Sequence, residues 1–199
     1  MTYPHVTLIR HGETEWSRTG RHTGHTDVPL TSTGRQQAVE LGEMLQGHSF
    51  DAVFTSPLSR ASETCRLAGL GEDAEPWHDL REWDYGDYEG RRTVDIRQTE
   101  PTWTIWTHTI HGGESLTQIS TRADRVVEAL AGRSGEVAVF AHGHVLRVIG
   151  ARWCGLDAGT GRALALATAS ISELGVERET PVIRSWNQLC HLRGTEPPV

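Results

Sequence analysis

The 199-residue sequence contains no lysine, so all 19 of its basic Lys and Arg positions are arginine. Acidic residues outnumber them at 26, which gives a formal net charge of −7. Nonspecific binding to a polyanion requires a broad basic surface that neutralises many phosphates. The acidic balance therefore argues against a nucleic-acid partner, and the role of each arginine has to be argued from its position.

Cysteine is scarce as well, since the chain has three, at scattered positions 65, 154 and 190. An odd, scattered set does not fit a disulfide framework and favours a reducing compartment. No apolar run approaches the roughly 20 residues that a membrane-spanning helix needs. The first residues, Met1 to His5, lack the basic and then apolar pattern of a secretory signal. We expect a cytoplasmic protein with no membrane partner.

Neither an internal repeat nor a low-complexity segment nor a domain linker interrupts the sequence. The length fits one domain with one sizeable core. We therefore expect a single domain over residues 1–193, followed by a flexible C-terminal tail over residues 194–199.

Short apolar runs predict three buried strands, each of which stops at polar residues. They are His5–Ile9, Ala52–Phe54 and Glu136–Ala141. Helical spacing of apolar side chains predicts four helices between and after these strands. The first three begin at 31–33, at 56–57 with proline in the first turn, and at 114–115, and they end near Gly47, Gly69 and Gly135; the fourth follows His144.

Two later runs, 164–174 and 182–189, alternate between apolar and polar residues and predict two more strands. Residues 10–30 are predicted to form a loop and residues 81–113 a long functional excursion, whose tryptophans either cover a substrate or pack within the excursion. This order of elements indicates an α/β domain with a largely parallel central sheet.

Polar residues that suit phosphate chemistry follow each of the three buried strands. Arg10 and His11 follow the first strand, Arg60 lies just beyond the second, and His142 follows the third. Ligands of open α/β sheets bind in the crevice outside the carboxyl ends of the strands. We therefore expect these four residues to converge on one site.

A histidine with two arginines can carry phosphoryl transfer. A neutral imidazole is nucleophilic near neutral pH and forms covalent intermediates. The guanidinium groups of Arg10 and Arg60 stay charged, and each can bind two phosphate oxygens. Gly12 and Gly143, next to the two histidines, let backbone N–H groups approach the phosphate. The pattern predicts His11 as the nucleophile, through either ring nitrogen.

A leaving alkoxide also needs a proton, which a carboxylic acid can supply. Glu82 is our candidate, because the neighbouring Trp83 and Tyr85 can remove water from around it. Asp84 is the alternative proton donor.

Histidines 142 and 144, together with His11, are also open to interpretation as metal ligands, since catalytic zinc commonly has three protein ligands. Two arginines in the same pocket would repel a cation, so we expect neither a metal nor another cofactor. In that case His144 caps the following helix or lines the rim of the pocket.

The segment LIRHGET at residues 8–14 resembles the signature of the histidine phosphatase superfamily, the phosphoglycerate mutase-like proteins. Further matching motifs follow in order along nearly the whole chain: TGHTD at 23–27, SPLSRA at 56–61, LRE at 80–82, GES at 113–115 and HG at 142–143. A single RHG match would be weak, whereas the ordered set is specific.

This resemblance implies a three-layer α/β/α sandwich without a metal. It also implies that His11 is the residue that becomes phosphorylated. Arg10, Arg60 and His142 would form the rest of the phosphate pocket, and Glu82 would be the proton donor.

Ser17 departs from the family pattern, because many members have asparagine at this position. A serine still offers a hydroxyl group to phosphate, but it reaches less far. Together with Thr23 and Gly24, it makes the sequence more similar to the branch of broad-specificity acid phosphatases and sugar bisphosphatases than to the mutases. We expect Ser17, Thr23, Gly24 and Gly143 to bind substrate.

The favoured function is a phosphatase that acts on a small phosphorylated metabolite, such as a sugar phosphate, with water as the final acceptor. A cofactor-dependent phosphoglycerate mutase is the alternative. Mutases carry an arginine pair in a proline-rich insertion, and the segment after Arg91–Arg92 lacks that proline-rich pattern. A non-catalytic phospho-ligand or protein-binding module would usually have lost the nucleophile or the acid. A homodimer is the assembly we consider.

Overall fold

The computed structural model describes residues 4–194, which form one six-stranded sheet in the order β3-β2-β4-β1-β5-β6. Four strands run parallel and two antiparallel strands extend one edge. The strands are β1 (His5–Arg10), β2 (Ala52–Thr55), β3 (Ala74–Pro76), β4 (Glu136–Ala141), β5 (Ile171–Glu177) and β6 (Thr180–Gln188). The predicted largely parallel sheet is therefore confirmed.

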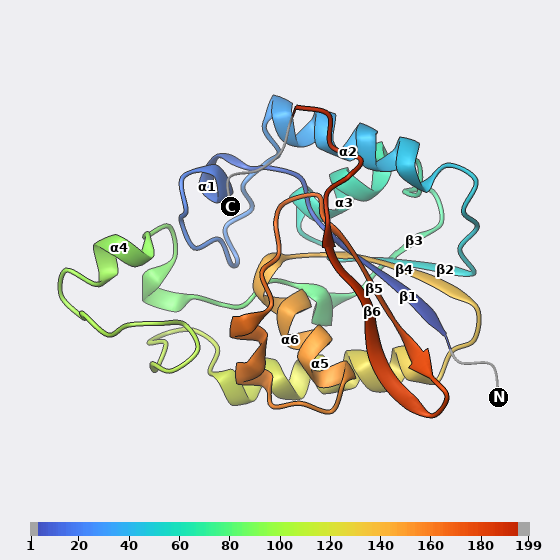
Figure 1. The fold of residues 1–199 in the computed structure, drawn as a ribbon. Coiled ribbons are helices and arrows are strands. Elements are labelled where there is room, and N and C mark those ends of the chain that lie inside the picture. The colour runs from blue at the N-terminus through green and yellow to red at the C-terminus, as the bar shows by residue number, and fades with distance from the viewer. Residues whose placement is uncertain (1–3, 195–199) are drawn as a thin grey trace.

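Helices cover both faces of this sheet, as Figure 1 shows. One face carries α2 (Ser32–Leu45) and α3 (Ser59–Leu67), and the other carries α5 (Leu116–Ala131) and α6 (Gly143–Trp153). Successive side chains of a strand point to opposite faces. In β1, accordingly, Leu8 packs in the core under α5 and α6, whereas Ile9 packs in the core under α2 and α3. The three-layer α/β/α sandwich is confirmed.

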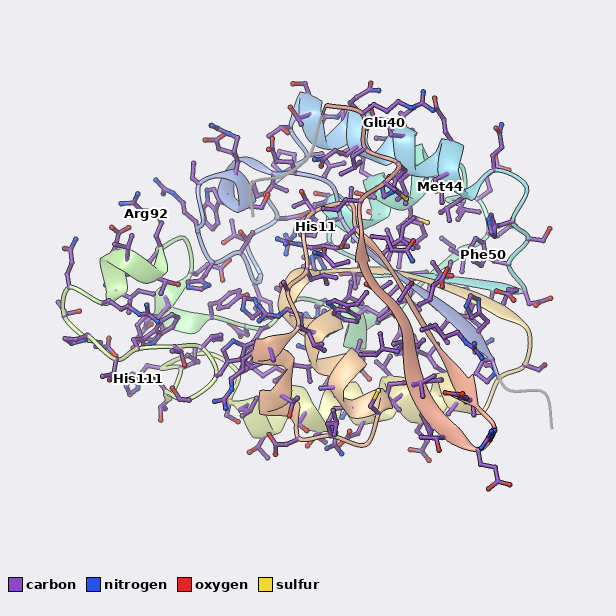
Figure 2. The ribbon with its side chains drawn as sticks, in the orientation of Figure 1. His11, Glu40, Met44, Phe50, Arg92 and His111 are labelled. Carbon is purple, nitrogen blue, oxygen red and sulfur yellow. The ribbon has the colours of Figure 1, made fainter. Side chains whose placement is uncertain are left out.

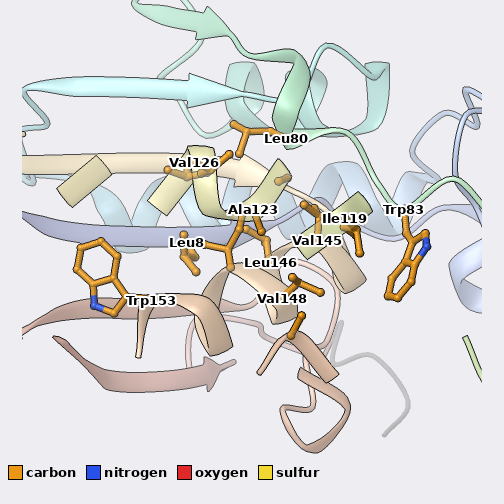
Figure 3. Packing of buried hydrophobic residues seen from close by; sticks show 14 of the residues in the cluster. Leu8, Leu80, Trp83, Ile119, Ala123, Val126, Val145, Leu146, Val148 and Trp153 are labelled. Atoms are coloured by element: carbon orange, nitrogen blue, oxygen red, sulfur yellow. The ribbon is translucent and has the colours of Figure 1, made fainter. Parts of the chain in front are cut away.

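The larger of the two cores lies between the sheet and the pair α5 and α6 (Figure 3). Leu8, Val126 and Leu146 are almost completely buried there. Each fully buried aliphatic side chain of this size contributes roughly 1.5–3 kcal/mol. Trp83, from the excursion, belongs to the same cluster. This core therefore holds the start of α6 and the excursion together.

Side-chain caps explain where two of the helices begin. Thr31 accepts a hydrogen bond from the backbone N–H of Gly34 at the start of α2. Ser115 and Gln118 form a reciprocal capping box at the start of α5. Both predicted starts are confirmed. The predicted end of the helix that starts at 114–115 is wrong, because α5 stops at Ala131 with Gly132 as its C-cap and does not extend to Gly135.

Two further boundaries differ from the prediction. The helix after β2 starts at Ser59 and not at 56–57, because the N–H of Ser56 continues the sheet ladder by bonding to the Phe140 carbonyl at 2.9 Å. Pro57 consequently lies outside the first turn. Residues 164–170 are not a strand: a 3-10 segment, η3 (Ala158–Ala163), precedes them, and β5 begins only at Ile171.

Two short elements lack a clear sequence signal. The predicted loop at residues 10–30 contains a single helical turn, α1 (Glu15–Arg18), which Thr14 caps. The edge strand β3 has three residues and two of them are exposed, so it shows no apolar alternation.

The excursion contains the 3-10 turns η1 (His78–Leu80) and η2 (Gly86–Tyr88) and the short helix α4 (Thr93–Ile96), and it lies to one side of the sandwich (Figure 1). Trp83 and Trp103 are buried in the larger core cluster and do not line the cavity beside His11, so their side chains serve packing. Among residues 4–194, no helix is both long enough and apolar enough to cross a bilayer. Of the predicted tail, residues 195–199 lie outside the described residues.

Candidate active site

The three strands β2, β4 and β1 are neighbours in the sheet and run parallel. The residues that follow them therefore lie at the same end of the sheet, beyond the carboxyl ends of the strands. His11 extends the ladder by donating its N–H to the Ala141 carbonyl at 3.0 Å. The rings of His11 and His142 come within 5.1 Å between centroids. Figure 2 shows His11 at the end of β1 that faces away from the N-terminus. The predicted convergence of the strand ends is therefore present in the structure.

The orientation of the His11 ring distinguishes its two nitrogens. Nδ1 lies 2.7 Å from the carbonyl oxygen of Gly12. A carbonyl oxygen can only accept, so Nδ1 carries the proton and donates it. The lone pair of the neutral ring is then on Nε2. Sequence alone left this choice open, and the hydrogen bond to Gly12 resolves it in favour of Nε2.

Burial and nearby arginines keep the His11 ring uncharged. Loss of solvent is the largest cause that holds its pKa well below the ordinary value of 6.5, and the positive charges of Arg60 and Arg10 act in the same direction. The hydrogen bond to the Gly12 carbonyl opposes them only weakly, being the smallest cause. An uncharged imidazole is the form that can attack phosphorus.

A cavity of about 190 Å³ opens beside His11. Six of the predicted site residues line it: Arg10, His11, Ser17, Thr23, Glu82 and Gly143. Gly24, Arg60 and His142 do not line it. Seven further residues complete the lining: Gly20, Arg21, His22, Tyr85, His144, Arg147 and Leu166. Three arginines around one carboxylate make this cavity suitable for an anionic ligand.

Arg10 is the arginine that follows β1 directly. Its Nη1 donates to the Leu166 carbonyl at 2.5 Å, while its buried Nε has no partner within residues 4–194. A buried donor without a partner is costly, so a ligand oxygen at this position would be favourable. A side chain at Gly143 would come within 3.3 Å of this guanidinium, which explains the glycine there.

Arg60 lies behind the cavity, where it is fully buried. Its Nη1 and Nη2 groups donate to the backbone carbonyls of Thr23, Gly24 and Thr26 at 3.0–3.1 Å. Its Nε donates to Nδ1 of His142 at 3.1 Å. Arg60 thus fixes the loop that carries Thr23 into the cavity wall.

His142 uses both of its ring nitrogens in contacts with the protein. Because Nδ1 accepts from Arg60, Nε2 carries the proton and donates to the Ser56 hydroxyl oxygen at 2.7 Å. Loss of solvent, followed by the charge of Arg60, holds the pKa of His142 well below 6.5. The ring is therefore neutral and fixed in one tautomer next to His11.

Glu82 caps the N-terminus of α6. Its Oε1 accepts from the N–H groups of Trp83 and Val145 at 2.9 Å, and its Oε2 accepts from the N–H of His144 at 3.0 Å. Oε2 therefore accepts one backbone bond and retains a lone pair that can hold a proton. The alternative donor, Asp84, does not line the cavity, and its Oδ1 accepts from the N–H of Gly86 at 3.0 Å.

Tyr85 and His144 contact each other on the cavity wall. The sequence did not predict this contact. Burial, followed by the charge of Glu82, raises the pKa of Tyr85 well above 10, so its O–H is retained. The Tyr85 hydroxyl oxygen lies 2.7 Å from Nδ1 of His144, and the two groups share a hydrogen bond. Burial, followed by the charge of Arg147, holds the pKa of His144 well below 6.5. The alternative that His144 lines the rim of the pocket is the one the structure supports.

Arg147 was also missed, although its spacing could have revealed it. It lies four residues after Gly143 in α6, and residues four apart share one face of a helix. Its guanidinium stacks on Trp106 with 4.9 Å to the ring centroid, and its Nε donates to the Gly161 carbonyl. Ser17 and Thr23, by contrast, were predicted, and both hydroxyl groups donate to nearby backbone carbonyls.

A metal centre is not evident in the described part of the chain, because residues 4–194 contain no group of three or more His, Cys, Asp or Glu side chains placed to hold an ion. The histidines at 142 and 144, which could be interpreted as ligands, hold Arg60 and Tyr85 in hydrogen bonds.

Comparison with known sequences identifies the family. The sequence pattern of the histidine phosphatase superfamily (branch 1) matches residues 6–189. The chain belongs to this superfamily. The acid phosphatase of Mycobacterium tuberculosis is 46% identical to this histidine phosphatase over 174 residues, which cover 85% of each protein. The sedoheptulose 1,7-bisphosphatase of Saccharomyces cerevisiae is 36% identical over 185 residues, which cover 77% of this chain and 68% of that protein.

Solved structures agree with this assignment. The structure of an open reading frame from Mycobacterium tuberculosis superposes with a TM-score of 0.85 at 41% identity, covering 92% of this chain and 96% of the other. This histidine phosphatase is a phosphoric monoester hydrolase that acts on small phosphate esters.

Proposed function

We propose that this enzyme hydrolyses small sugar phosphates through a phosphohistidine formed on Nε2 of His11. The observation that carries this proposal is the hydrogen bond from Nδ1 of His11 to the Gly12 carbonyl. It leaves the lone pair on Nε2 in a ring that lines the same cavity as Arg10 and Glu82. Nucleophile, cation and proton donor thus share one small space.

The first step transfers the phosphoryl group to the enzyme. The lone pair of His11 Nε2 forms a bond to phosphorus while the ester P–O bond breaks. The electron pair of the broken bond goes to the leaving oxygen, which takes the proton of Glu82. The second step reverses these roles: a water oxygen attacks phosphorus, its proton passes to the Glu82 carboxylate, and the N–P bond breaks back onto Nε2.

Arg10 and the backbone N–H of Gly143 hold the phosphoryl oxygens in this proposal. The unpartnered Nε of Arg10 supplies one donor. Gly143 is the first residue of α6, so its N–H lacks a helical acceptor, whereas the next two N–H groups, of His144 and Val145, donate to Glu82. Arg60 and His142 stay predicted phosphate ligands. A bond from either one to phosphate would replace a bond that it makes here to the protein.

The size and charge of the cavity support the substrate class. A volume of about 190 Å³ suits a small ester and not a polymer. Phosphorylated sugars are small, anionic and rich in hydroxyl groups, which Ser17 and Thr23 can bind. One relative is named for action on a sugar bisphosphate and another as an acid phosphatase, which supports the same class.

Phosphate release from a panel of pure esters tests the proposal. The panel comprises sugar monophosphates, sugar bisphosphates, phosphoglycerates and a phosphopeptide, with His11→Ala as the control for contaminating activity. We expect the highest kcat/KM on a sugar phosphate and no turnover by His11→Ala. Substantial turnover by His11→Ala, or preference for the phosphopeptide, would refute the proposal.

A coupled assay for conversion of 3- to 2-phosphoglycerate tests the mutase alternative. We expect phosphate release to dominate, because the arginines expected to serve a mutase are used elsewhere. Arg92, the N-cap residue of α4, is bound to Asp95 at 2.7 Å and lies away from His11 (Figure 2). The cytoplasmic location and the homodimer stay predictions, which cell fractionation and light scattering test.

A further inference from the structure

The loop that carries Glu82 has little regular structure of its own. It follows the single turn η1, and residues 81–85 belong to neither a helix nor a strand. A proton donor must nevertheless be held within hydrogen-bond reach of the leaving oxygen. Bonds from outside the loop therefore decide how well Glu82 is placed.

Arg122, in the middle of α5, supplies such bonds. Its Nη1 donates to the backbone carbonyls of Asp79 and Arg81 at 2.7 and 2.6 Å. Its Nη2 also reaches the carbonyl of Glu82 itself, at 3.4 Å. One guanidinium thus binds the main chain before and at the proton donor. Arg122 is 9% exposed and does not line the cavity beside His11.

Glu114 fixes the orientation of that guanidinium. Its two carboxylate oxygens accept from Nε and Nη2 of Arg122 at 2.9 and 2.7 Å, a two-point contact that sets the plane of the fork. The main chain of Glu114 also binds the far side of the loop. Its N–H donates to the Asp84 carbonyl at 2.9 Å, and its carbonyl accepts from Nε1 of Trp83 at 2.6 Å.

We infer that Arg122 and Glu114 are positioning residues for proton donation by Glu82. This inference rests on the proposed function, in which Glu82 protonates the leaving oxygen. The pair grips the loop on both sides of Glu82, while the N-terminus of α6 binds the carboxylate itself. A displacement of about 1 Å at a reacting group can cost about 100-fold in rate. The contacts of Arg122 and Glu114 with the loop therefore affect the rate, although neither residue touches the substrate.

A comparison of two substrates separates this role from a purely structural one. The leaving group of p-nitrophenyl phosphate is stable as an anion and needs little help from an acid, whereas the alkoxide of glycerol phosphate needs a proton. The ratio of the two kcat/KM values does not depend on the fraction of enzyme that is folded. A positioning role changes this ratio, and general destabilisation does not.

The variants are Arg122→Gln, Glu114→Gln and Arg122→Lys, with Glu82→Gln as the benchmark. We expect Arg122→Gln to lower kcat/KM for glycerol phosphate by about 10- to 100-fold more than for p-nitrophenyl phosphate. Glu114→Gln keeps one acceptor for Arg122, so we expect a smaller selective loss of kcat/KM for glycerol phosphate. This variant replaces Arg122→Gln in the test if Arg122→Gln does not fold. Arg122→Lys keeps the charge with fewer acceptors in reach. We therefore expect its ratio of the two kcat/KM values to lie between those of the parent enzyme and Arg122→Gln.

Arg125→Gln is the matched control. Arg125 lies one turn further along α5 and also makes a two-point contact, to the Asp79 carboxylate at 2.7 and 3.0 Å, but it binds no carbonyl of the loop. We expect its ratio to equal that of the parent enzyme. A parental ratio in Arg122→Gln and Glu114→Gln, with a selective loss in Glu82→Gln, would overturn the inference alone. An equal loss on both substrates in Glu82→Gln would overturn the inference together with the proton-donor assignment.

Discussion

Arg60 donates from Nε to Nδ1 of His142 at 3.1 Å, and this contact joins two residues that sequence motifs place in the phosphate pocket. The same guanidinium binds three loop carbonyls, so the pair ties the 23–26 loop to the end of β4. Both residues are completely buried. The charge of Arg60 and the hydrogen bonds of both residues therefore shape the wall of the cavity from behind.

We predict that Arg60→Ala strongly destabilises the fold. It would leave three backbone carbonyls, of which that of Gly24 is buried, and the buried Nδ1 of His142 without their donor. The loss costs about 3 kcal/mol or more in the free energy of unfolding. Urea denaturation measures this. Arg35→Ala is the control, because Arg35 pairs with Glu63 at the surface, and an exposed pair contributes less than about 1 kcal/mol. Equal losses in the two variants would contradict the structural role of Arg60.

The tautomer and charge of His11 can be observed directly. Because burial and two arginines hold its pKa well below 6.5, we expect a neutral ring with the proton on Nδ1 at pH 6.5, where an ordinary histidine is half protonated. Long-range ¹H–¹⁵N spectra of labelled enzyme report both properties, and His11→Gln assigns the signals. A titration near pH 6.5, or a proton on Nε2, would disagree with the geometry.

Buried neutral histidines should also make stability depend on pH. Burial lowers the pKa of His22 from 6.5 to about 4, so between these values the unfolded state binds a proton that the folded state does not. Stability is then full above about pH 6.5 and is lost on acidification, by about 1.4 kcal/mol per pH unit for this residue. We expect His22→Gln to flatten the pH dependence of the unfolding free energy between pH 4 and 6.5. Parallel curves for the two proteins across that range would contradict the prediction.

The backbone beside the nucleophile leaves no space for a side chain at Gly12. A Cβ there would collide with the carbonyl group of Gly34. We predict that Gly12→Ala lowers the unfolding free energy by about 1–3 kcal/mol and displaces His11, with loss of activity. Gly132→Ala is the control, because its nearest neighbour would be the Glu128 carbonyl at 3.5 Å, and its φ of −77° suits alanine. Thermal melts of both variants, with activity assays, test the contrast.

Local patterns were sufficient to predict much of the fold. The apolar runs that became β1, β2 and β4 are buried on both sides, and the caps Thr31 and Ser115 mark helix starts chemically. The edge strand β3 could not be predicted, because two of its three residues are exposed. The region 164–170 alternates like a strand, yet it turns past the site, where Leu166 binds Arg10 through its carbonyl.

Part of the candidate site could also be predicted from sequence motifs, and part could not. Motifs identified residues that immediately follow strands, such as His11 and His142, because topology alone brings strand ends together. They did not reveal which nitrogen of His11 is free, since that depends on one hydrogen bond to a neighbouring carbonyl. They also missed Arg122, because its role depends on contacts with a loop about 40 residues away in the chain.

Trapping the covalent intermediate tests the proposed mechanism most directly. Enzyme mixed rapidly with ³²P-labelled substrate and quenched in alkali, where phosphohistidine survives, is digested and its labelled peptide mapped, and ³¹P NMR identifies the isomer. We expect one labelled site, on Nε2 of His11, and no label in His11→Ala. Label on another residue or on Nδ1, or turnover without any label during the first cycle, would contradict the proposed mechanism.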